Sequence, residues 1–185
     1  MRLWLWTAAA VALASAAGQA NAAMTVFGGG FAEECSKAAF LDKSDDRSMQ
    51  TCDQALADDT LDPRDRAGTF INRGVMKMKR RAYESARADF DVAIAMVPTI
   101  GEGWINRGAD YVAEKRYRDG ISDLSKGIEL GIREPEKAYY NRALAEEGID
   151  DEKSAYLDYQ QAIVLKPDWD LPREELLRFT VTRAP

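Results

Sequence analysis

A short triplet recurs along the chain at a nearly fixed spacing. Asn-Arg-Gly occupies positions 72–74 and 106–108, and Asn-Arg-Ala occupies 141–143, so the period is about 34 residues. A repeat of this size is one supersecondary unit that cannot bury its apolar face alone, and neighbouring units must stack. The chain is therefore predicted to be a solenoid, and this architecture favours binding over catalysis.

The other regular positions of each repeat have helical spacing. Small and large apolar residues alternate three and four apart, which places them on one face of a helix. Small residues let two helix backbones approach, while the large ones fill the space beside them. Each repeat is thus predicted to be two antiparallel helices of about 14 residues. The face is formed by Ala86, Phe90 and Ala93, then Gly120, Leu124 and Gly127, then Ala155, Tyr159 and Ala162.

An aromatic residue before each triplet and a closing proline complete a pattern that resembles the tetratricopeptide-repeat family. The resemblance covers about residues 66–169, in three tandem copies. It implies an all-α fold, a short α-solenoid of antiparallel helix pairs with a right-handed superhelical twist. The middle repeat departs from the family at Gly120 and Gly127, where alanine is usual. Each glycine costs a helix about 1 kcal/mol relative to alanine, so this helix is expected to be the softest. The aromatics are Phe70, Trp104 and Tyr139, and the prolines are Pro98 and Pro167.

Flanking segments extend the solenoid at both ends. A weaker repeat precedes the three clear ones, and Pro172 can begin a helix whose Leu176, Leu177 and Phe179 cover the last repeat. The predicted organisation is a signal peptide at 1–22, a flexible lead at 23–31, a degenerate helical hairpin at 32–65, repeats at 66–100, 101–135 and 136–169, and a C-terminal capping helix and tail at 170–185.

The first residues have the pattern of an export signal. Arg2 precedes an apolar run of about 15 residues, which is short for a membrane span of roughly 20. Alanines at 20 and 22 suit cleavage before Ala23. We expect a periplasmic or secreted protein of a Gram-negative bacterium. Retention of the segment as an N-terminal anchor is the alternative.

Composition excludes several classes of function. The chain has no histidine, so Ser-His-Asp and Cys-His catalysis and histidine-based zinc or haem sites are ruled out. The formal charge is -6, with acidic and basic residues interspersed, which disfavours binding to nucleic acid or anionic lipid. No catalytic residue, cofactor site or metal site is identified, and the chain is interpreted as a non-enzyme.

Two cysteines fall in the degenerate hairpin. When this hairpin is aligned with the repeats, Cys35 occupies the place of Arg73, and Cys52 occupies the place of Phe90. These positions face each other across the hairpin, so a structural disulfide is predicted. The alternatives are unpaired thiols or a redox pair, although the spacing is not that of a Cys-x-x-Cys motif.

Two polar ladders follow from the triplet. Arg73, Arg107 and Arg142 are each followed sixteen residues later by an aspartate, which predicts an ion pair within each repeat. Asn72, Asn106 and Asn141 point about 100° away around the same helices. In the family resembled, this position can hold the backbone of a bound peptide, because an amide offers donors and an acceptor. A local hydrogen bond to the neighbouring helix is the alternative.

An apolar inner face is expected around the asparagines. It comprises Ile71, Val75, Ile105, Val112, Tyr140 and Leu144. It is either an open groove for a protein segment or the packing between adjacent first helices. The family's basic clamp for C-terminal carboxylates is matched in type at Lys137 but opposed by Glu102, which disfavours chaperone tails as ligands.

Two functions are consistent with these features. The first is a periplasmic scaffold or adaptor that binds a protein or peptide segment in the concave groove, and the second is a structural subunit packed permanently in a cell-envelope assembly. The sequence names neither the partner nor the oligomeric state, and the fold alone does not choose between them.

Overall fold

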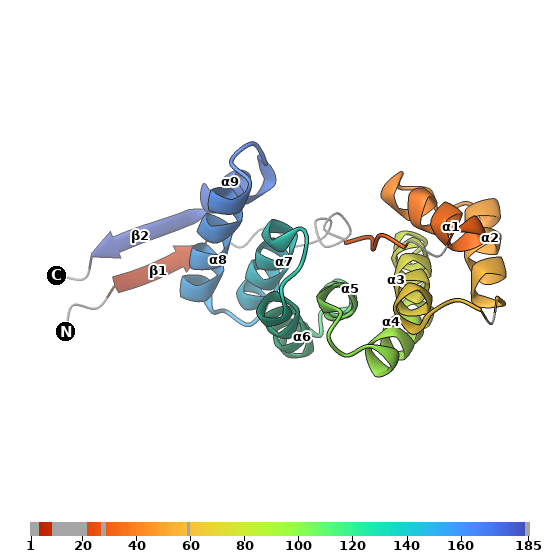
Figure 1. Ribbon diagram of the computed structural model, residues 1–185. Coiled ribbons are helices and arrows are strands. Elements are labelled where there is room, and N and C mark those ends of the chain that lie inside the picture. Colours follow the sequence, from red (N-terminus) through yellow and green to blue (C-terminus); the bar gives the residue numbers. More distant parts are fainter. Residues whose placement is uncertain (1–3, 9–21, 27–28, 59, 184–185) are drawn as a thin grey trace.

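The protein is a row of paired helices with a short two-stranded ladder at one end. The computed structural model describes residues 4–8, 22–26, 29–58 and 60–183 (Figure 1). The helices are α1 Gly30–Phe40, α2 Asp46–Leu56, α3 Pro63–Lys79, α4 Tyr83–Met96, α5 Gly101–Ala113, α6 Tyr117–Leu130, α7 Pro135–Glu147, α8 Glu152–Leu165 and α9 Leu171–Leu176, and the strands are β1 Trp4–Ala8 and β2 Phe179–Arg183. Consecutive helices α1 to α8 pack as four pairs. The predicted all-α solenoid is confirmed.

All four helix pairs share one turn. Asp42, Arg81, Lys115 and Asp150 each have a positive φ of 59–63° just after the first helix. The residue that follows donates its N–H to a carbonyl five residues back, as Ala82 does to Lys77. This pattern is the Schellman motif, which satisfies carbonyls at a helix C-terminus. Because the α1–α2 pair has the same turn, the degenerate hairpin is a true member of the row.

The first clear repeat begins earlier than expected. Asp62 accepts hydrogen bonds from the N–H groups of Arg64 and Asp65, and Pro63 is the first residue of α3. Proline is favoured at this position because its missing donor would be unpaired there in any case. The helix therefore starts three residues before the predicted boundary at 66.

The first hairpin is closed by a disulfide. The structure bonds Cys35 of α1 to Cys52 of α2, with a Cα–Cα distance of 4.9 Å. Both cysteines are fully buried and pack with Ala39 and Met76, so they join this hairpin to α3. The position that holds an arginine in the other repeats here holds half of a covalent link.

The C-terminal cap differs in part from its prediction. Leu176 and Phe179 pack on the cluster around Tyr140 and Tyr159, as expected, but Leu177 is 86% exposed. The chain leaves α9 after one turn and a half and continues as β2, which pairs antiparallel with β1. This pairing was not predicted, and β1 lies within the predicted signal peptide. Most of that peptide, residues 9–21, and the tail at 184–185 lie outside the described residues.

The lead before α1 is held against the solenoid. Residues 22–26 pass between α5 and the α1–α3 pair (Figure 1). Ala22, Met24 and Val26 are buried while Ala23 and Thr25 are half-buried, a period of two that is typical of an extended chain. The expectation of a flexible lead therefore does not hold for these residues, because their main chain has partners. Among the described residues, no helix is long and apolar enough to span a bilayer.

Candidate functional site

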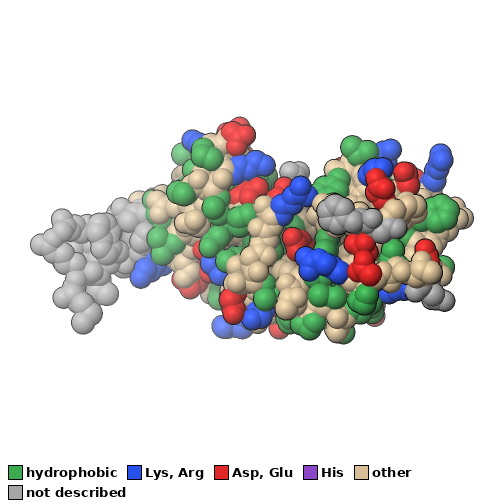
Figure 2. All heavy atoms as spheres, viewed as in Figure 1, with side chains coloured by type: hydrophobic (Ala, Val, Ile, Leu, Met, Phe, Trp, Pro, Cys, Tyr) green, Lys and Arg blue, Asp and Glu red, His purple; other side chains and the backbone are tan. Residues whose placement is uncertain are grey.

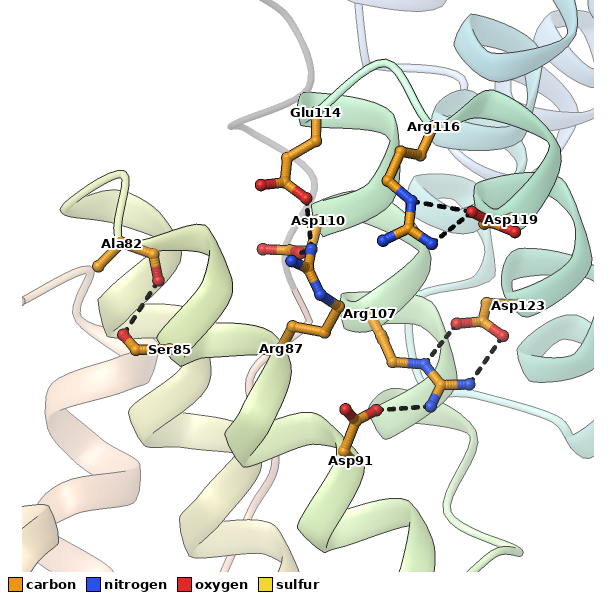
Figure 3. A network of polar contacts seen from close by, with 10 residues as sticks. All are labelled: Ala82, Ser85, Arg87, Asp91, Arg107, Asp110, Glu114, Arg116, Asp119 and Asp123. Atoms are coloured by element: carbon orange, nitrogen blue, oxygen red, sulfur yellow. Dashed lines mark hydrogen bonds and ion pairs between the residues drawn. The ribbon is translucent and has the colours of Figure 1, made fainter.

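The arginines of the triplets form a seam inside each helix pair. Arg107 Nε and Nη2 donate to the two carboxylate oxygens of Asp123 at 2.6 and 3.0 Å (Figure 3). Arg73 binds Asp89 and Arg142 binds Asp158 in the same two-pronged geometry. The predicted ion pair is thus confirmed in all three repeats. A paired, mostly buried guanidinium fixes the register of the two helices.

The third donor of each arginine reaches the preceding helix pair. Nη1 of Arg73 binds Asp53 of α2 at 2.7 Å, and Nη1 of Arg107 binds Asp91 of α4 at 2.7 Å. Nη1 of Arg142 binds the hydroxyl of Ser125 on α6 at 3.0 Å. The sequence reasoning missed these links, because their acceptors vary in type. The seam therefore joins repeats as well as helices.

The aromatic ahead of each triplet has a defined place beside this seam. The guanidinium of each arginine lies over its ring, with a distance of 4.9 Å from Arg107 to the ring of Trp104. Phe70 and Tyr139 take the same place in the first and third repeats. These contacts are cation–π interactions, and they help to hold the arginine side chains in one orientation.

The asparagines that precede these arginines form hydrogen bonds with the backbone of the lead, residues 22–26. Asn72 accepts from the N–H of Met24 and donates to its carbonyl, both at 2.8 Å. Asn106 does the same to Ala22, at 3.0 and 2.7 Å, and also donates to the carbonyl of Glu102. Each side-chain amide therefore forms hydrogen bonds with both the N–H and the carbonyl of one residue. The asparagines of successive repeats bind residues two apart in the lead. This is the chemistry expected for a bound peptide, supplied here by the chain itself.

The third asparagine lies at the equivalent place on α7. Asn141 is fully buried, like Asn72 and Asn106. The amides thus come from the first helices of three consecutive repeats, which form one side of the solenoid.

The apolar residues of the expected inner face are packed. Ile71, Val75, Ile105, Val112, Tyr140 and Leu144 have at most 6% of their surface exposed. Ile71, for example, clusters with Met24 and lies next to Gly103 of the following first helix. Their positions thus match the alternative in which they fill the space between repeats. An open apolar groove is absent along this face as far as the described residues show it, since the lead covers part of it.

Gly68 leaves room for the lead. A β-carbon at this position would lie 2.9 Å from Cγ2 of Val26 and 3.2 Å from Sδ of Met24. Contacts this short are not tolerated without movement. Glycine is therefore required at position 68 because residues 24–26 pack against it. The helix itself does not require glycine, which lowers helix stability.

A cavity of about 1350 Å³ opens beside the lead. Ala23 and Thr25 line it, together with residues of α1, Lys79 and the start of α7. Arg133 reaches across and donates to the hydroxyl of Thr25 at 2.8 Å. Lys137, the one residue that matches a carboxylate clamp, pairs with Glu134. Figure 2 shows this side of the molecule as a surface of mixed charge with a hollowed upper edge.

Two buried carboxylates have raised pKa values. Burial raises the pKa of Asp110 to about 7, although the paired Arg87 opposes the shift. Burial and the negative charge of Asp158 raise the pKa of Glu146 to about 8. Asp110 lies near the end of α5, where Arg87 of α4 donates to it and to Glu114 (Figure 3). Within the described residues, no group of three acidic or cysteine side chains could hold a metal ion.

Known proteins share this architecture. No family model matches the chain. In sequence it is 32% identical over 87 residues to the Hsp70-Hsp90 organizing protein of Triticum aestivum, a match that covers 46% of this chain. The chain spans only 14% of the length of that relative.

Solved structures resemble most of the helical row. The Arabidopsis OM64 TPR domain has a TM-score of 0.60 at 20% identity and covers 63% of this chain and 96% of its own. The second TPR domain of human RPAP3, in complex with an HSP70 peptide, has a TM-score of 0.58 at 23% identity over 63% and 96%. MamA from Desulfovibrio magneticus RS-1 reaches 0.63 at 18% identity, over 81% and 84%.

These likenesses establish the fold. Stacked helix pairs with a 34-residue period define the class as an α-solenoid of helical repeats. The chain has the tetratricopeptide-repeat fold, as its three aligned repeats predict.

Proposed function

We propose that the chain is a non-enzymatic interaction scaffold that binds an extended protein segment along its asparagine-bearing face. The observation that carries this proposal is the pairing of Asn72 and Asn106 with both main-chain groups of Met24 and Ala22. Main-chain recognition of this kind accepts an extended segment of any sequence, and pockets for alternate side chains then add selectivity.

Similar proteins support this use of the fold. One structural neighbour is described in complex with an HSP70 peptide, and the matching wheat protein is named for organizing Hsp70 and Hsp90. Here Lys137 and Lys79 are already paired with Glu134 and Asp42. We therefore propose a partner held by its main chain rather than by a terminal carboxylate.

We further propose that the protein is exported to the periplasm or secreted, with cleavage before Ala23. The signal pattern of the first 22 residues supports this, as does the Cys35–Cys52 disulfide, because disulfides persist in oxidising compartments. Cleavage would remove Ala22, leaving Asn106 available to a partner while Met24 stays on Asn72.

The test is site-specific photo-crosslinking in the native host. A crosslinking residue at Phe40, which is exposed and lines the cavity, should capture one dominant partner. The matched control is Ala88, which is exposed on the second helix α4. Capture at Ala88 and not at Phe40 would show that the binding side has been misassigned.

A permanent structural subunit is the second candidate. It is favoured by large apolar side chains that are exposed near the C-terminal end of the solenoid, namely Leu157 and Val164 on α8 and Leu177 just after α9. A chain that is monodisperse and monomeric at micromolar concentration would count against this candidate. Aggregation that a co-expressed partner relieves would support it.

A further inference from the structure

Residues 22–26 already supply what a bound segment would supply. The N–H and carbonyl of Met24 are taken by Asn72, and those of Ala22 are taken by Asn106. The hydroxyl of Ser36 on α1 adds a further bond to the carbonyl of Met24 at 2.9 Å. The segment is thus held from two sides, by the first helices of two repeats and by the degenerate hairpin.

The side chains of the lead fill matching space. Met24 packs among Ala67, Ile71 and Ile100, and Val26 packs with Ala32 and Ala55. Gly68 lies directly under both, and a β-carbon there would collide with them. The fit is therefore specific in side chains as well as in main chain.

We propose that the lead is an intramolecular ligand of this groove, which a partner segment must replace in order to bind. Residues 22–26 occupy both Asn72 and Asn106 in the uncleaved chain, and after cleavage before Ala23 the remaining residues still occupy Asn72. This inference rests on the proposed function. The partner segment it implies is extended, with a small residue where Ala22 lies and apolar residues at the places of Met24 and Val26.

Tethering makes the lead a strong competitor. A segment joined to its site by a short linker acts at an effective concentration in the millimolar range. Only a partner with added contacts can displace it, and the cavity beside Ala23 and Thr25 offers room for those contacts. An extended chain that binds the asparagine face more weakly than the tethered lead is therefore excluded.

The first test is hydrogen exchange measured by NMR on the full chain with residues 1–22 retained. The amides of Met24 and Ala22 should exchange at least tenfold more slowly than in an unstructured chain. Asn72→Ala should release the Met24 amide selectively, and Asn106→Ala should release the Ala22 amide, so each variant is the control for the other. Exchange of both amides at the unprotected rate in the unaltered chain would overturn the inference.

The second test is competition by a fluorescein-labelled peptide with the sequence of residues 22–26, acetylated and amidated. Met24→Pro removes the N–H that Asn72 accepts and should raise the affinity for this peptide at least tenfold. Ala23→Pro is the matched control, because no hydrogen bond of the Ala23 N–H is found among the described residues, and it should have a smaller effect. Equal affinity of the unaltered chain and Met24→Pro would contradict an intramolecular ligand.

Hydrogen exchange, taken together with the crosslinking at Phe40 described above, separates this inference from the proposed function. Protected amides without capture of any partner at Phe40 would leave the intramolecular ligand in place and reject the scaffold. Partner capture with unprotected amides would retain the scaffold and reject the intramolecular ligand.

Discussion

Two regions of the molecule are built from neighbouring residues of the same triplet. The arginines form the seam inside the helix pairs, and the asparagines form the face that binds the lead. Arg107 and Asn106 recur with the same period, and both make two-pronged hydrogen bonds. An aspartate equivalent to Asp123, the partner of Arg107, recurs in every repeat. The residue that Asn106 binds through both its N–H and its carbonyl, Ala22, instead belongs to a segment outside the repeats. A repeated residue whose partner is also repeated maintains the solenoid. A repeated residue without a repeated partner is available for a ligand.

The largest expected effect is on the seam. Arg107→Ala leaves the carboxylates of Asp123 and Asp91 without their cation, and removal of one member of a buried pair costs about 3 kcal/mol or more. Asn106→Ala, one residue away, should cost about 1 kcal/mol or less, because the lead can leave and be hydrated. Urea unfolding of both variants measures the difference. Equal losses would show that the two ladders are alike.

The disulfide replaces the seam in the first hairpin. Cys35 occupies the arginine position, so a covalent bond takes the place of the ion pair in this hairpin. Because that bond closes a loop in the unfolded chain, its reduction should lower the free energy of unfolding by about 3 kcal/mol. The first and second helices should then lose protection in hydrogen exchange before the three clear repeats do. Thiol titration of the unreduced chain should find no free cysteine, and two reactive thiols would contradict the account of this hairpin.

The seam should also be sensitive to pH. The pKa of Glu146 is raised from 4.5 to about 8, so the folded state holds a proton that the unfolded state releases as pH rises between these values. Stability should therefore fall across this range, by an amount on the order of 1 kcal/mol after allowance for solvent screening. Glu146→Gln should flatten the slope measured by urea unfolding from pH 5 to 8. An unchanged slope would reject this assignment.

The smallest expected effect is that of Gly68→Ala, and the sign of its change in unfolding free energy tests whether the lead occupies the asparagine face. Gly68→Ala should improve the helix by up to about 1 kcal/mol, but its β-carbon would meet Val26. We expect a small loss of stability in the unaltered chain and a small gain in the Met24→Pro background, both measured by urea unfolding. The same sign in both backgrounds would mean that the lead does not occupy the groove.

Sequence periodicity was sufficient for the solenoid but not for the lead. The helix pairs, the Arg–Asp pairs and the pairing of Cys35 with Cys52 all follow from positions that repeat along the chain. Residues 22–26 do not repeat, and their few apolar residues give only a weak extended pattern. Their binding depends on tertiary contacts with Asn72, Asn106 and Gly68, which no local signal reports.

The middle repeat shows a second limit of reasoning from sequence. Gly120 and Gly127 were expected to be small residues of the helix interface and to make their helix the softest. The structure brings α5 and α6 so close that a β-carbon on Gly127 would lie 2.5 Å from Ile105 and 3.0 Å from the carbonyl of Gly101. Glycine is therefore needed for the approach of the two helices, and its cost in helix propensity is offset by packing.

The most direct test of main-chain recognition is the affinity of the Met24→Pro chain for the labelled peptide of residues 22–26, with and without Asn106→Ala. Fluorescence anisotropy gives the affinity, and thermal unfolding of the same samples checks the fold. If the asparagines recognise the main chain, Asn106→Ala should weaken binding of the peptide at least tenfold and leave the melting temperature nearly unchanged. Equal affinities for the two chains would contradict it.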